Sequence, residues 1–389
     1  MGKEHLLIPG PTPLPPEVLE AAGKQMINHR SLPFAGILQR VIAGAKEVFQ
    51  TEHDVLLLTS SGTGGLEAAV VNTLSPGDLV LGLSCGFFGD RFADIAEAYG
   101  AKVERIAVEW GKPVPPDLVA DRLRRDRRGE IKAILVTHND TSTGVTNDVR
   151  AIAEARGAHP ALLLVDGVSA VGAVDCQTDA WGLDVVVTAS QKALMSPPGI
   201  ALVAVGPRAW EATQYARMPR YYFDFGEAKR FLERTVAQTP FTPAISVLYA
   251  LDVALSRIKQ VGLQNWIARH ALMARATREG VRALGLPLLA EEPYASNAVT
   301  AVRVPEGLDV RRLVSRLKEK HGVVVAGGQG PLEGKVFRIG HLGYVGREDI
   351  LAALAALEEA LPALGFPVER GRGVAAAEEV FATALEVLR

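Results

Sequence analysis

The sequence predicts an α/β protein built on a mainly parallel, doubly wound sheet, with a smaller α+β region at its C-terminal end. Between residues 52 and 205, short apolar and β-branched runs alternate with segments of helical periodicity. Several of the short runs are apolar throughout, as is typical of strands that helices cover on both faces. With 389 residues the chain is also too long for one compact core, which favours two packed domains.

Strands are expected in the first part at 55–59, 79–83, 103–106, 133–137, 162–166, 185–188 and 201–205. Helices are expected between them at 65–74, 91–99, 116–125 and 149–156. In an open α/β sheet, ligands bind at the carboxyl ends of the strands. The unusual residues of this chain cluster just after the strands, so we expect the functional site at that edge.

The second part mixes helices and strands. A polar and aromatic stretch around 218–231 precedes a long helix expected at 243–260. Strands are expected near 298–304, 323–326 and 336–339, and a Gly/Pro-rich patch at 365–373 precedes a final helix at about 375–388. No internal repeat or low-complexity segment is visible.

Composition excludes several classes of protein. A net charge of -2 gives no electrostatic reason to expect a nucleic-acid or membrane partner. The two cysteines, Cys85 and Cys176, lack metal-ligand spacing, exclude a disulfide framework and favour a reducing cytoplasm. The first apolar run is too short for a signal peptide, and no later stretch approaches about 18 apolar residues. We expect a soluble, cytoplasmic protein with no metal.

A Gly-rich turn follows the first expected strand, in Leu58–Glu67 (LTSSGTGGLE). Backbone N–H groups at the helix start form an anion site there, and the hydroxyls of Ser61 and Thr63 add donors. The turn is not a P-loop, because no Gly-Lys-Ser/Thr follows, and Glu67 replaces the third glycine of the dinucleotide fingerprint. A turn that only reverses the chain direction remains an alternative.

Two charged residues follow later apolar strands. Asp166 ends the strand in Leu162–Gly172 (LLLVDGVSAVG), where a buried carboxylate needs a cationic partner or caps a helix. Lys192, in Val187–Gly199 (VTASQKALMSPPG), stands in apolar surroundings that lower a lysine pKa and make the amine nucleophilic. A phosphate cup, an acid for a pyridine nitrogen and a Schiff-base lysine are the groups that pyridoxal phosphate (PLP) requires.

With these motifs the sequence resembles the class V, fold-type I aminotransferases, in particular the alanine/serine–glyoxylate (serine–pyruvate) branch. The resemblance runs from Pro9–Pro13 (PGPTP) to Arg338–Gly343 (RIGHLG), and Ser-Gln-Lys with the later Pro-Pro-Gly is its most specific motif. It implies an N-terminal segment, 1–20, that lines the active site. It also implies a large PLP-binding domain, 21–258, and a small C-terminal domain, 259–389.

The resemblance also implies roles for the cofactor-binding residues. Lys192 forms the Schiff base and then moves the proton of the substrate, and Asp166 keeps the pyridine nitrogen protonated. Val168 packs on one face of the ring and Phe88, where the family often has tryptophan, stacks more weakly on the other. The phosphate is held by Ser61, Gly62 and Thr63, with a side-chain contact from Gln191, and Thr141 or Ser142 contacts the side of the ring hydroxyl. Relatives can have histidine in place of Thr63.

Further residues are implied at the subunit boundary and around the substrate. Phe241–Tyr249 (FTPAISVLY) matches a segment that reaches the phosphate of a neighbouring subunit through Thr242 and Thr239, which implies a homodimer. Arg338 matches the arginine that binds the substrate carboxylate, because its fork pairs two oxygens. Gly10 lines the other side of that carboxylate, and Arg30 either reads a distal group of the substrate or forms a structural ion pair.

The expected reaction is transamination of alanine or serine with glyoxylate or pyruvate, by ping-pong kinetics through pyridoxamine phosphate. A short monocarboxylate donor fits one carboxylate arginine and no second obvious cation. A donor with a distal anion, aspartate or an aminophosphonate, is the alternative. A class V lyase or desulfurase, a nicotinamide dehydrogenase and a catalytically inactive subunit or regulator remain as other readings. A desulfurase would need a mobile cysteine late in the chain, and none follows Cys176.

Overall fold

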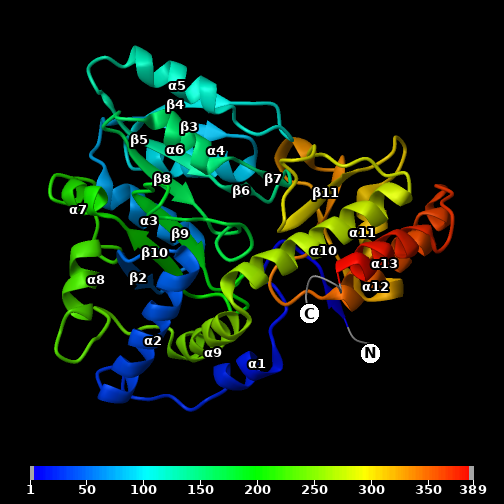
Figure 1. Ribbon diagram of the computed structural model, residues 1–389, viewed down its shortest axis with the longest axis horizontal. Helices are drawn as coiled ribbons and strands as arrows, with labels where there is room; N and C mark the ends of the chain where they lie inside the picture. Colours follow the sequence, from blue (N-terminus) through cyan, green and yellow to red (C-terminus); the bar gives the residue numbers. More distant parts are fainter. Residues whose placement is uncertain (1–3, 385–389) are drawn as a thin grey trace.

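The computed structural model of the chain describes residues 4–384 and has the expected α/β architecture. A seven-stranded sheet has the strand order β2-β10-β9-β8-β5-β3-β4 (Figure 1). The bounds are β2 (Asp54–Leu58), β3 (Leu79–Ser84), β4 (Lys102–Ala107), β5 (Ile131–Thr137), β8 (Leu162–Asp166), β9 (Val185–Ala189) and β10 (Ala201–Val205). Each of the seven strands expected in this part of the sequence is present, and the sheet is parallel apart from β10.

Strand β10 runs antiparallel to both of its neighbours, β2 and β9. Its direction follows from the connection before it, because residues 190–200 contain no crossover helix between β9 and β10. The carboxyl ends of β2, β9, β8, β5 and β3 therefore lie together at one edge of the sheet. The amino ends of the same strands lie at the opposite edge.

Helices cover both faces of this sheet, as the apolar strands predicted. The expected helices are present as α3 (Gly62–Thr73), α4 (Phe87–Ala98), α5 (Pro116–Arg125), α6 (Val149–Arg156) and α9 (Ile245–Val261). The sequence analysis missed α2 (Leu32–Phe49), α7 (Pro207–Thr213) and α8 (Phe225–Leu232), and it began α4 at residue 91. Leu57 of β2 packs with the core that contains α2 and α9, whereas Leu56 and Leu58 pack with the core of α3 and α8.

The C-terminal third forms a separate hydrophobic core beside the large sheet (Figure 1). Its sheet has the order β11-β14-β13, and all of its pairs are antiparallel. The elements are α10 (Leu263–Ala283), β11 (Val299–Arg303), α11 (Val310–His321), β12 (Val323–Val324), β13 (Ala326–Gly327), β14 (Val336–Gly340), α12 (Arg347–Ala360) and α13 (Arg372–Ala384). The final expected helix corresponds to α13, and residues 385–388 of that expectation lie outside the described residues.

The strand expected at 323–326 is two short strands in two different sheets. β12 pairs in parallel with the N-terminal β1 (His5–Leu6), whereas β13 joins β14. Leu7 is buried in the C-terminal core, so the start of the chain belongs to that core. The short α1 (Pro16–Ala22) instead packs against α9. The three-part division of the chain stays a prediction.

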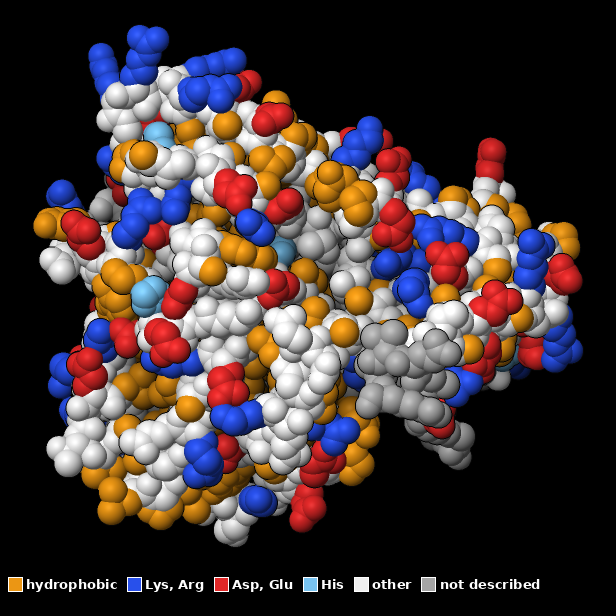
Figure 2. Space-filling view, in the orientation of Figure 1, with side chains coloured by type: hydrophobic (Ala, Val, Ile, Leu, Met, Phe, Trp, Pro, Cys, Tyr) orange, Lys and Arg blue, Asp and Glu red, His pale blue; other side chains and the backbone are white. Residues whose placement is uncertain are grey.

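On the face shown in Figure 2, acidic and basic side chains are interspersed, and Lys and Arg side chains gather at the top, over α5. The last turn of α5 carries Arg122, Arg124 and Arg125. Among residues 4–384 no helix is long and apolar enough to cross a membrane.

Candidate active site

A cavity of about 260 Å³ lies at the carboxyl edge of the large sheet. Nine residues predicted from the sequence line it: Ser61, Gly62, Thr63, Phe88, Thr141, Asp166, Val168, Gln191 and Lys192. These residues lie at the end of β8 or in the segments that directly follow β2, β3, β5, β8 and β9, so the strand order brings them together. The predicted residues therefore lie together at the edge where the site was expected, and their roles stay predictions.

One end of the cavity is the start of α3. Ser61 is extended, with φ -75° and ψ 170°, and its side chain makes no capping hydrogen bond to the helix. The hydroxyl is therefore available to a ligand, together with the first N–H groups of the helix. A Cβ on Gly62 would lie 2.6 Å from Val168 Cγ2, so only glycine allows the helix start and Val168 to approach this closely.

Asp166, at the end of β8, is a buried carboxylate with two hydrogen bonds. Its Oδ1 accepts from Val168 N at 3.0 Å, and its Oδ2 accepts from Thr137 Oγ1 at 3.2 Å. Thr137 is its partner in the pairing of β5 with β8. Burial raises the pKa of Asp166 to about 6, against these hydrogen bonds and the charge of Lys192. A cation placed against the carboxylate would stabilise its charged form.

Lys192 lies in the turn that follows β9. Its Nζ donates to Pro9 O at 2.5 Å. Burial lowers the pKa of Lys192 to about 8, although Asp166 opposes the shift, and Arg338 and Arg91 add to it. The amine is therefore unprotonated at a lower pH than an ordinary lysine, which suits a nucleophile.

The turn around Lys192 is held in a strained conformation. Met195 has φ 50°, a left-handed conformation that side chains disfavour, and its N–H donates to Lys192 O at 3.0 Å. The N-terminal segment braces the turn, because Thr12 donates to Lys192 O through Oγ1 and to Gln191 O through its N–H. Strain and bracing together fix the direction of the lysine side chain.

The N-terminal segment passes directly over the lysine. A Cβ on Gly10 would lie 2.6 Å from Lys192 Nζ, and Gly10 has φ 123°. Only glycine therefore fits at position 10, because any side chain would collide with Lys192. This placement supports the prediction that residues 1–20 line the active site, and it puts Gly10 beside the amine.

A second buried carboxylate, Asp140, fixes Phe88. Its oxygens accept from the N–H groups of Phe88 and Gly89, at 3.0 and 3.2 Å, and from Ser142 Oγ at 2.5 Å. Burial raises the pKa of Asp140, against these hydrogen bonds. Ser142 is fully buried in this contact, whereas Thr141 lines the cavity. Of the two residues predicted for the ring hydroxyl, Thr141 is therefore the one that a ligand can reach.

Arg338, in β14, lies behind the cavity wall. Its Nη1 donates to Thr141 O and to Gln329 Oε1, both at 3.0 Å, and its Nε donates to Gly327 O at 2.8 Å. Burial lowers the pKa of Arg338 to about 10, although the charge of Asp140 opposes the shift. Arg338 forms no ion pair with a carboxylate of residues 4–384. A structural ion pair is therefore not its role within the described chain.

Three predicted residues lie away from the cavity. Arg30 donates from Nη1 to Gln238 Oε1 and Thr239 O, both at 2.8 Å, and from Nη2 to Pro240 O at 3.2 Å. The Thr239 hydroxyl donates to Phe241 O at 2.7 Å, and Thr242 is exposed. Their predicted roles require a second subunit or a moved loop, and they stay predictions.

The sequence analysis missed five lining residues: Leu66, Arg91, Asn139, Ser169 and Gln329. Asn139 and Ser169 follow strand ends, so their position after β5 and β8 was a usable signal. Asn139 Nδ2 donates to Ser169 Oγ at 2.9 Å. Arg91 lines the cavity in addition to Arg338 behind its wall, so the expectation of no second cation near the substrate is wrong. If the helix had been expected to begin at Phe87, Arg91 would have been placed one turn after Phe88, on the same face of the helix.

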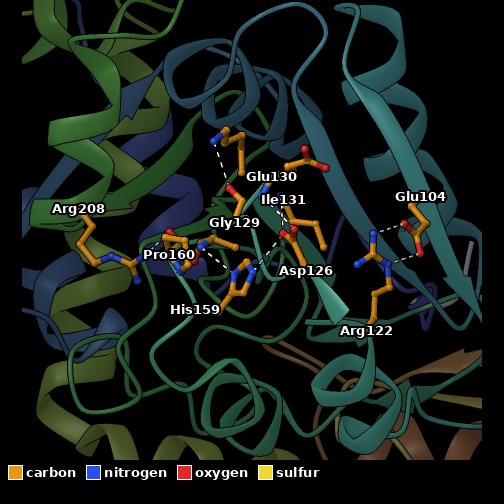
Figure 3. Close-up of polar contacts among 11 residues, drawn as sticks. Glu104, Arg122, Asp126, Gly129, Glu130, Ile131, His159, Pro160 and Arg208 are labelled. Carbon is orange, nitrogen blue, oxygen red and sulfur yellow. Dashed lines mark hydrogen bonds and ion pairs between the residues drawn. The ribbon is translucent and has the colours of Figure 1, made fainter. Parts of the chain in front are cut away.

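A larger cavity, of about 830 Å³, lies at the opposite edge of the sheet. It is lined by residues at the amino ends of β5 and β8, the C-terminal end of α3, and α7. Figure 3 shows the contacts beside it, where Asp126 Oδ2 lies 3.2 Å from His159 Nε2 and accepts from Ile131 N at 2.8 Å. Burial opposes ionisation of Asp126, but these contacts outweigh it and lower its pKa. No predicted residue lies there.

The residues at the carboxyl edge fit PLP. Gln191 Oε1 is buried and has no hydrogen-bond partner among the described residues, so a bound group could complete the hydrogen bonding of the carboxamide. Rotation of the carboxamide would present its Nε2 donors instead. Asp166 offers a carboxylate to the pyridine nitrogen, Lys192 an amine to the aldehyde, and the start of α3 an anion site to the phosphate. The pyridine nitrogen, the aldehyde and the phosphate of PLP thus each have a complementary group here.

Comparison with known proteins gives the family. The Aminotransferase class-V family matches residues 5–344. The chain therefore belongs to the class-V aminotransferases. It is an aminotransferase that depends on PLP, as the family and its fold-type I structural neighbours do, and its substrates are amino acids and 2-oxo acids.

Its relatives match over nearly their full length. The small subunit of a soluble hydrogenase from Synechococcus sp. is 46% identical, over 98% of this chain and 99% of the relative. The L-aspartate–glyoxylate aminotransferase of Paracoccus denitrificans is 42% identical over 96% and 95%. The serine–glyoxylate aminotransferase of Arabidopsis thaliana is 39% identical over 97% and 94%.

The fold also matches solved structures. The crystal structure of pyridoxamine–pyruvate aminotransferase from Mesorhizobium loti superposes with a TM-score of 0.93 and 33% identity over 97% of each chain. The predicted fold class and the predicted family are confirmed.

Proposed function

We propose that this protein transfers the amino group of alanine or serine to glyoxylate or pyruvate, in two half-reactions at the cavity of the carboxyl edge. The observation that carries the proposal is the arrangement of Lys192 and Asp166. Both line one cavity of about 260 Å³, and the pKa of each is shifted so that its neutral form is favoured. Arg338 lies behind the same cavity and has no carboxylate partner in residues 4–384.

When bound, PLP supplies an electron sink for the bond broken at the substrate Cα. The protein residues do the rest. Asp166 holds a proton on the pyridine nitrogen, since a cation there is the partner that its buried carboxylate lacks. The Lys192 amine would accept the proton from the substrate Cα, hold it and later donate it. Arg338 binds the substrate carboxylate and so fixes the direction of the Cα–H bond.

The small size of the cavity supports a short donor. The serine–glyoxylate aminotransferase of Arabidopsis thaliana shares 39% identity over nearly the whole chain, and its name gives serine as the donor and glyoxylate as the acceptor. The Nη1 atom of Arg338 already donates to Thr141 O and to Gln329 Oε1. These hydrogen bonds orient the guanidinium before the substrate carboxylate binds to it.

An aspartate donor is the second candidate. The Paracoccus denitrificans relative is named for aspartate and glyoxylate, and Arg91 is the observation that favours it here. A desulfurase reaction has little support. Both cysteines are buried, and burial raises the pKa of Cys85 and raises that of Cys176 to about 12, so neither is a ready nucleophile.

One relative is named as a hydrogenase subunit. A chain that had lost catalysis would be expected to lose Lys192, Asp166 or Arg338, and all three are present. These residues support catalysis by this chain.

The proposal includes a homodimer. Thr242 is exposed beside an aromatic surface in which the rings of Tyr222 and Phe241 stack at 4.8 Å. Tyr221, with 81% of its surface exposed, lies against the same Phe241 ring. Such a surface suits a second copy of the chain, which would bring Thr242 to the phosphate of its partner.

The test is the absorbance spectrum of the purified, PLP-loaded protein before and after addition of alanine, serine or aspartate. We expect a visible band that a true donor converts to a near-ultraviolet band, and that glyoxylate or pyruvate restores. Conversion by serine or alanine alone supports the first candidate, and conversion by aspartate alone supports the second. A protein that develops no band with PLP would overturn the proposal.

A further inference from the structure

We infer that Arg91 is an oxyanion-binding residue of this active site. The oxyanion comes either from the cofactor phosphate or from the distal carboxylate of a dicarboxylic amino donor, and the experiment below separates the two. This inference rests on the proposed function, because it assumes that PLP and an amino acid occupy the cavity of about 260 Å³.

Arg91 is held in place by two aromatic rings. It lies in α4, and its guanidinium carbon is 4.9 Å from the centre of the Phe87 ring and 5.0 Å from that of Phe88. Phe88 lines the cavity with it, and Asp140 anchors the start of the helix through the Phe88 and Gly89 N–H groups. Stacking orients a guanidinium while leaving the N–H donors at its edge free.

Arg91 has no acceptor within the described chain. Among residues 4–384 it forms neither an ion pair nor a side-chain hydrogen bond. Asp94, one turn further along the same helix, is instead engaged by Arg105 at 2.8 Å, as is Glu97. The nearby Asp140 is already bound by N–H and hydroxyl donors. A half-buried arginine with its donors free is suited to a ligand.

The charges around the cavity favour an anionic ligand. Arg91, Asp166 and Lys192 are the charged residues among those that line it. Lys192 loses its charge when its amine becomes the nucleophile, and Asp166 is assigned to the pyridine nitrogen. Arg91 is then the lining cation that remains for a phosphate or a carboxylate. Its charge also contributes to the lowered pKa of Lys192, so it acts within the same electrostatic field.

The experiment compares wild type with Arg91→Met, which keeps the length but removes the charge, and with Arg91→Lys, which keeps the charge. Dissociation constants are measured by titrating the apoprotein with PLP and with pyridoxal, which lacks the phosphate. KM is measured for aspartate and for alanine. Arg150→Met is the matched control, because Arg150 is exposed on α6 and, among residues 4–384, pairs only with Glu154.

If Arg91 binds the phosphate, Arg91→Met weakens PLP binding about tenfold or more and leaves pyridoxal binding unchanged. If it binds a distal carboxylate, KM for aspartate rises about tenfold or more while that for alanine stays the same. Arg91→Lys should recover part of either effect. The PLP-to-pyridoxal ratio of dissociation constants and the aspartate-to-alanine ratio of KM values are the two readouts. If Arg91→Met changes neither ratio by more than about twofold, Arg91 only supports Phe88 and the inference is wrong.

Failure of this inference is distinguishable from failure of the proposed function. In the first case the wild-type protein still forms its visible band with PLP and catalyses the reaction. The Arg91 variants then have the same ratios of dissociation constants and of KM values as the wild type. In the second case the wild-type protein forms no band. A circular dichroism spectrum of each variant checks that it is folded before its ratios are compared.

Discussion

The two edges of the large sheet carry two cavities of opposite character. The cavity at the carboxyl edge is the smaller, about 260 Å³ against 830 Å³, yet it contains Asp166 and Lys192 with pKa values of about 6 and 8. At the amino edge, Asp126 has hydrogen-bond partners that lower its pKa (Figure 3). The difference indicates that buried ionisable groups without an ion pair among the described residues point to function, and that the volume of a cavity does not.

The direction of the helices reinforces this difference. The N-terminal end of α3 faces the carboxyl edge, where the helix dipole favours an anion. The C-terminal end of the same helix, at Thr73, lines the larger cavity and presents carbonyl groups there. An anionic cofactor is therefore favoured at the first edge and disfavoured by α3 at the second.

The largest expected effect is from Lys192→Ala. Removing the amine should reduce turnover by about 10⁴-fold, because both nucleophile and proton carrier are lost. PLP should still bind, without the visible band of the lysine-linked cofactor. Single-turnover assays with alanine and serine measure the loss. Retention of even about a tenth of wild-type activity would remove Lys192 from the chemistry.

Asp166→Asn should reduce turnover about 10³-fold, since asparagine carries no charge to hold the pyridine proton. It should also change the pH dependence of stability. In the apoprotein, burial raises the pKa of Asp166 from 3.8 to about 6, so the folded state binds a proton more tightly than the unfolded state. Wild-type apoprotein should therefore lose stability relative to the variant as pH rises from about 4 to 6, by about 3 kcal/mol in total.

Urea unfolding of both apoproteins at several pH values checks the pH dependence. Thr137→Val is the control, because it removes one hydrogen bond to the same carboxylate while keeping the charge. Parallel curves for wild type and Asp166→Asn would show that the carboxylate is not held against its ionisation. The contrast between the two edges of the sheet would then lose its electrostatic basis.

Arg338→Ala should raise KM for the amino donor about 100-fold, because a buried guanidinium that pairs a carboxylate is lost. The dissociation constant of PLP should stay within about twofold, since Arg338 lies behind Thr141 and Gln329. Steady-state kinetics with a separate PLP titration measures both quantities. An unchanged KM for each amino acid tested would contradict the assignment.

The smallest effect is expected at the amino edge. Lys132→Met and Arg217→Met both remove a cation that lines the larger cavity. If that cavity plays no part in the reaction, kcat, KM and PLP affinity should each stay within about twofold of wild type. A larger change in any of the three would mean that the two edges are coupled, and the comparison would have to be revised.

Much of the fold could be predicted because the strands of the large sheet, apart from the edge strand β4, are buried on both faces. Such strands read as continuous apolar runs, and the seven expected strands are present. The helices α2, α7 and α8 were missed. In α2, the N-cap is Ser31, whose hydroxyl accepts from Phe34 N, and a proline follows at its second position. These signals were available in the sequence. In α8, the polar and aromatic stretch hid a short helix capped by Asp224.

The sequence by itself determined the class of chemistry. Lys192, Asp166 and the Gly-rich turn after β2 each stand at the end of an apolar strand, and parallel strands bring such ends to one edge. The inference that these residues meet at one edge needs only the pattern of apolar residues and the parallel direction of the strands.

Tertiary structure decided which side chains face the cavity and which are engaged elsewhere. Arg30 is bound to the loop at Gln238, Ser142 is buried against Asp140, and Arg91 is left free at the cavity. The physical reason is that an arginine or serine can satisfy its hydrogen bonds with many partners. Only the packing of distant segments determines which partners are within reach.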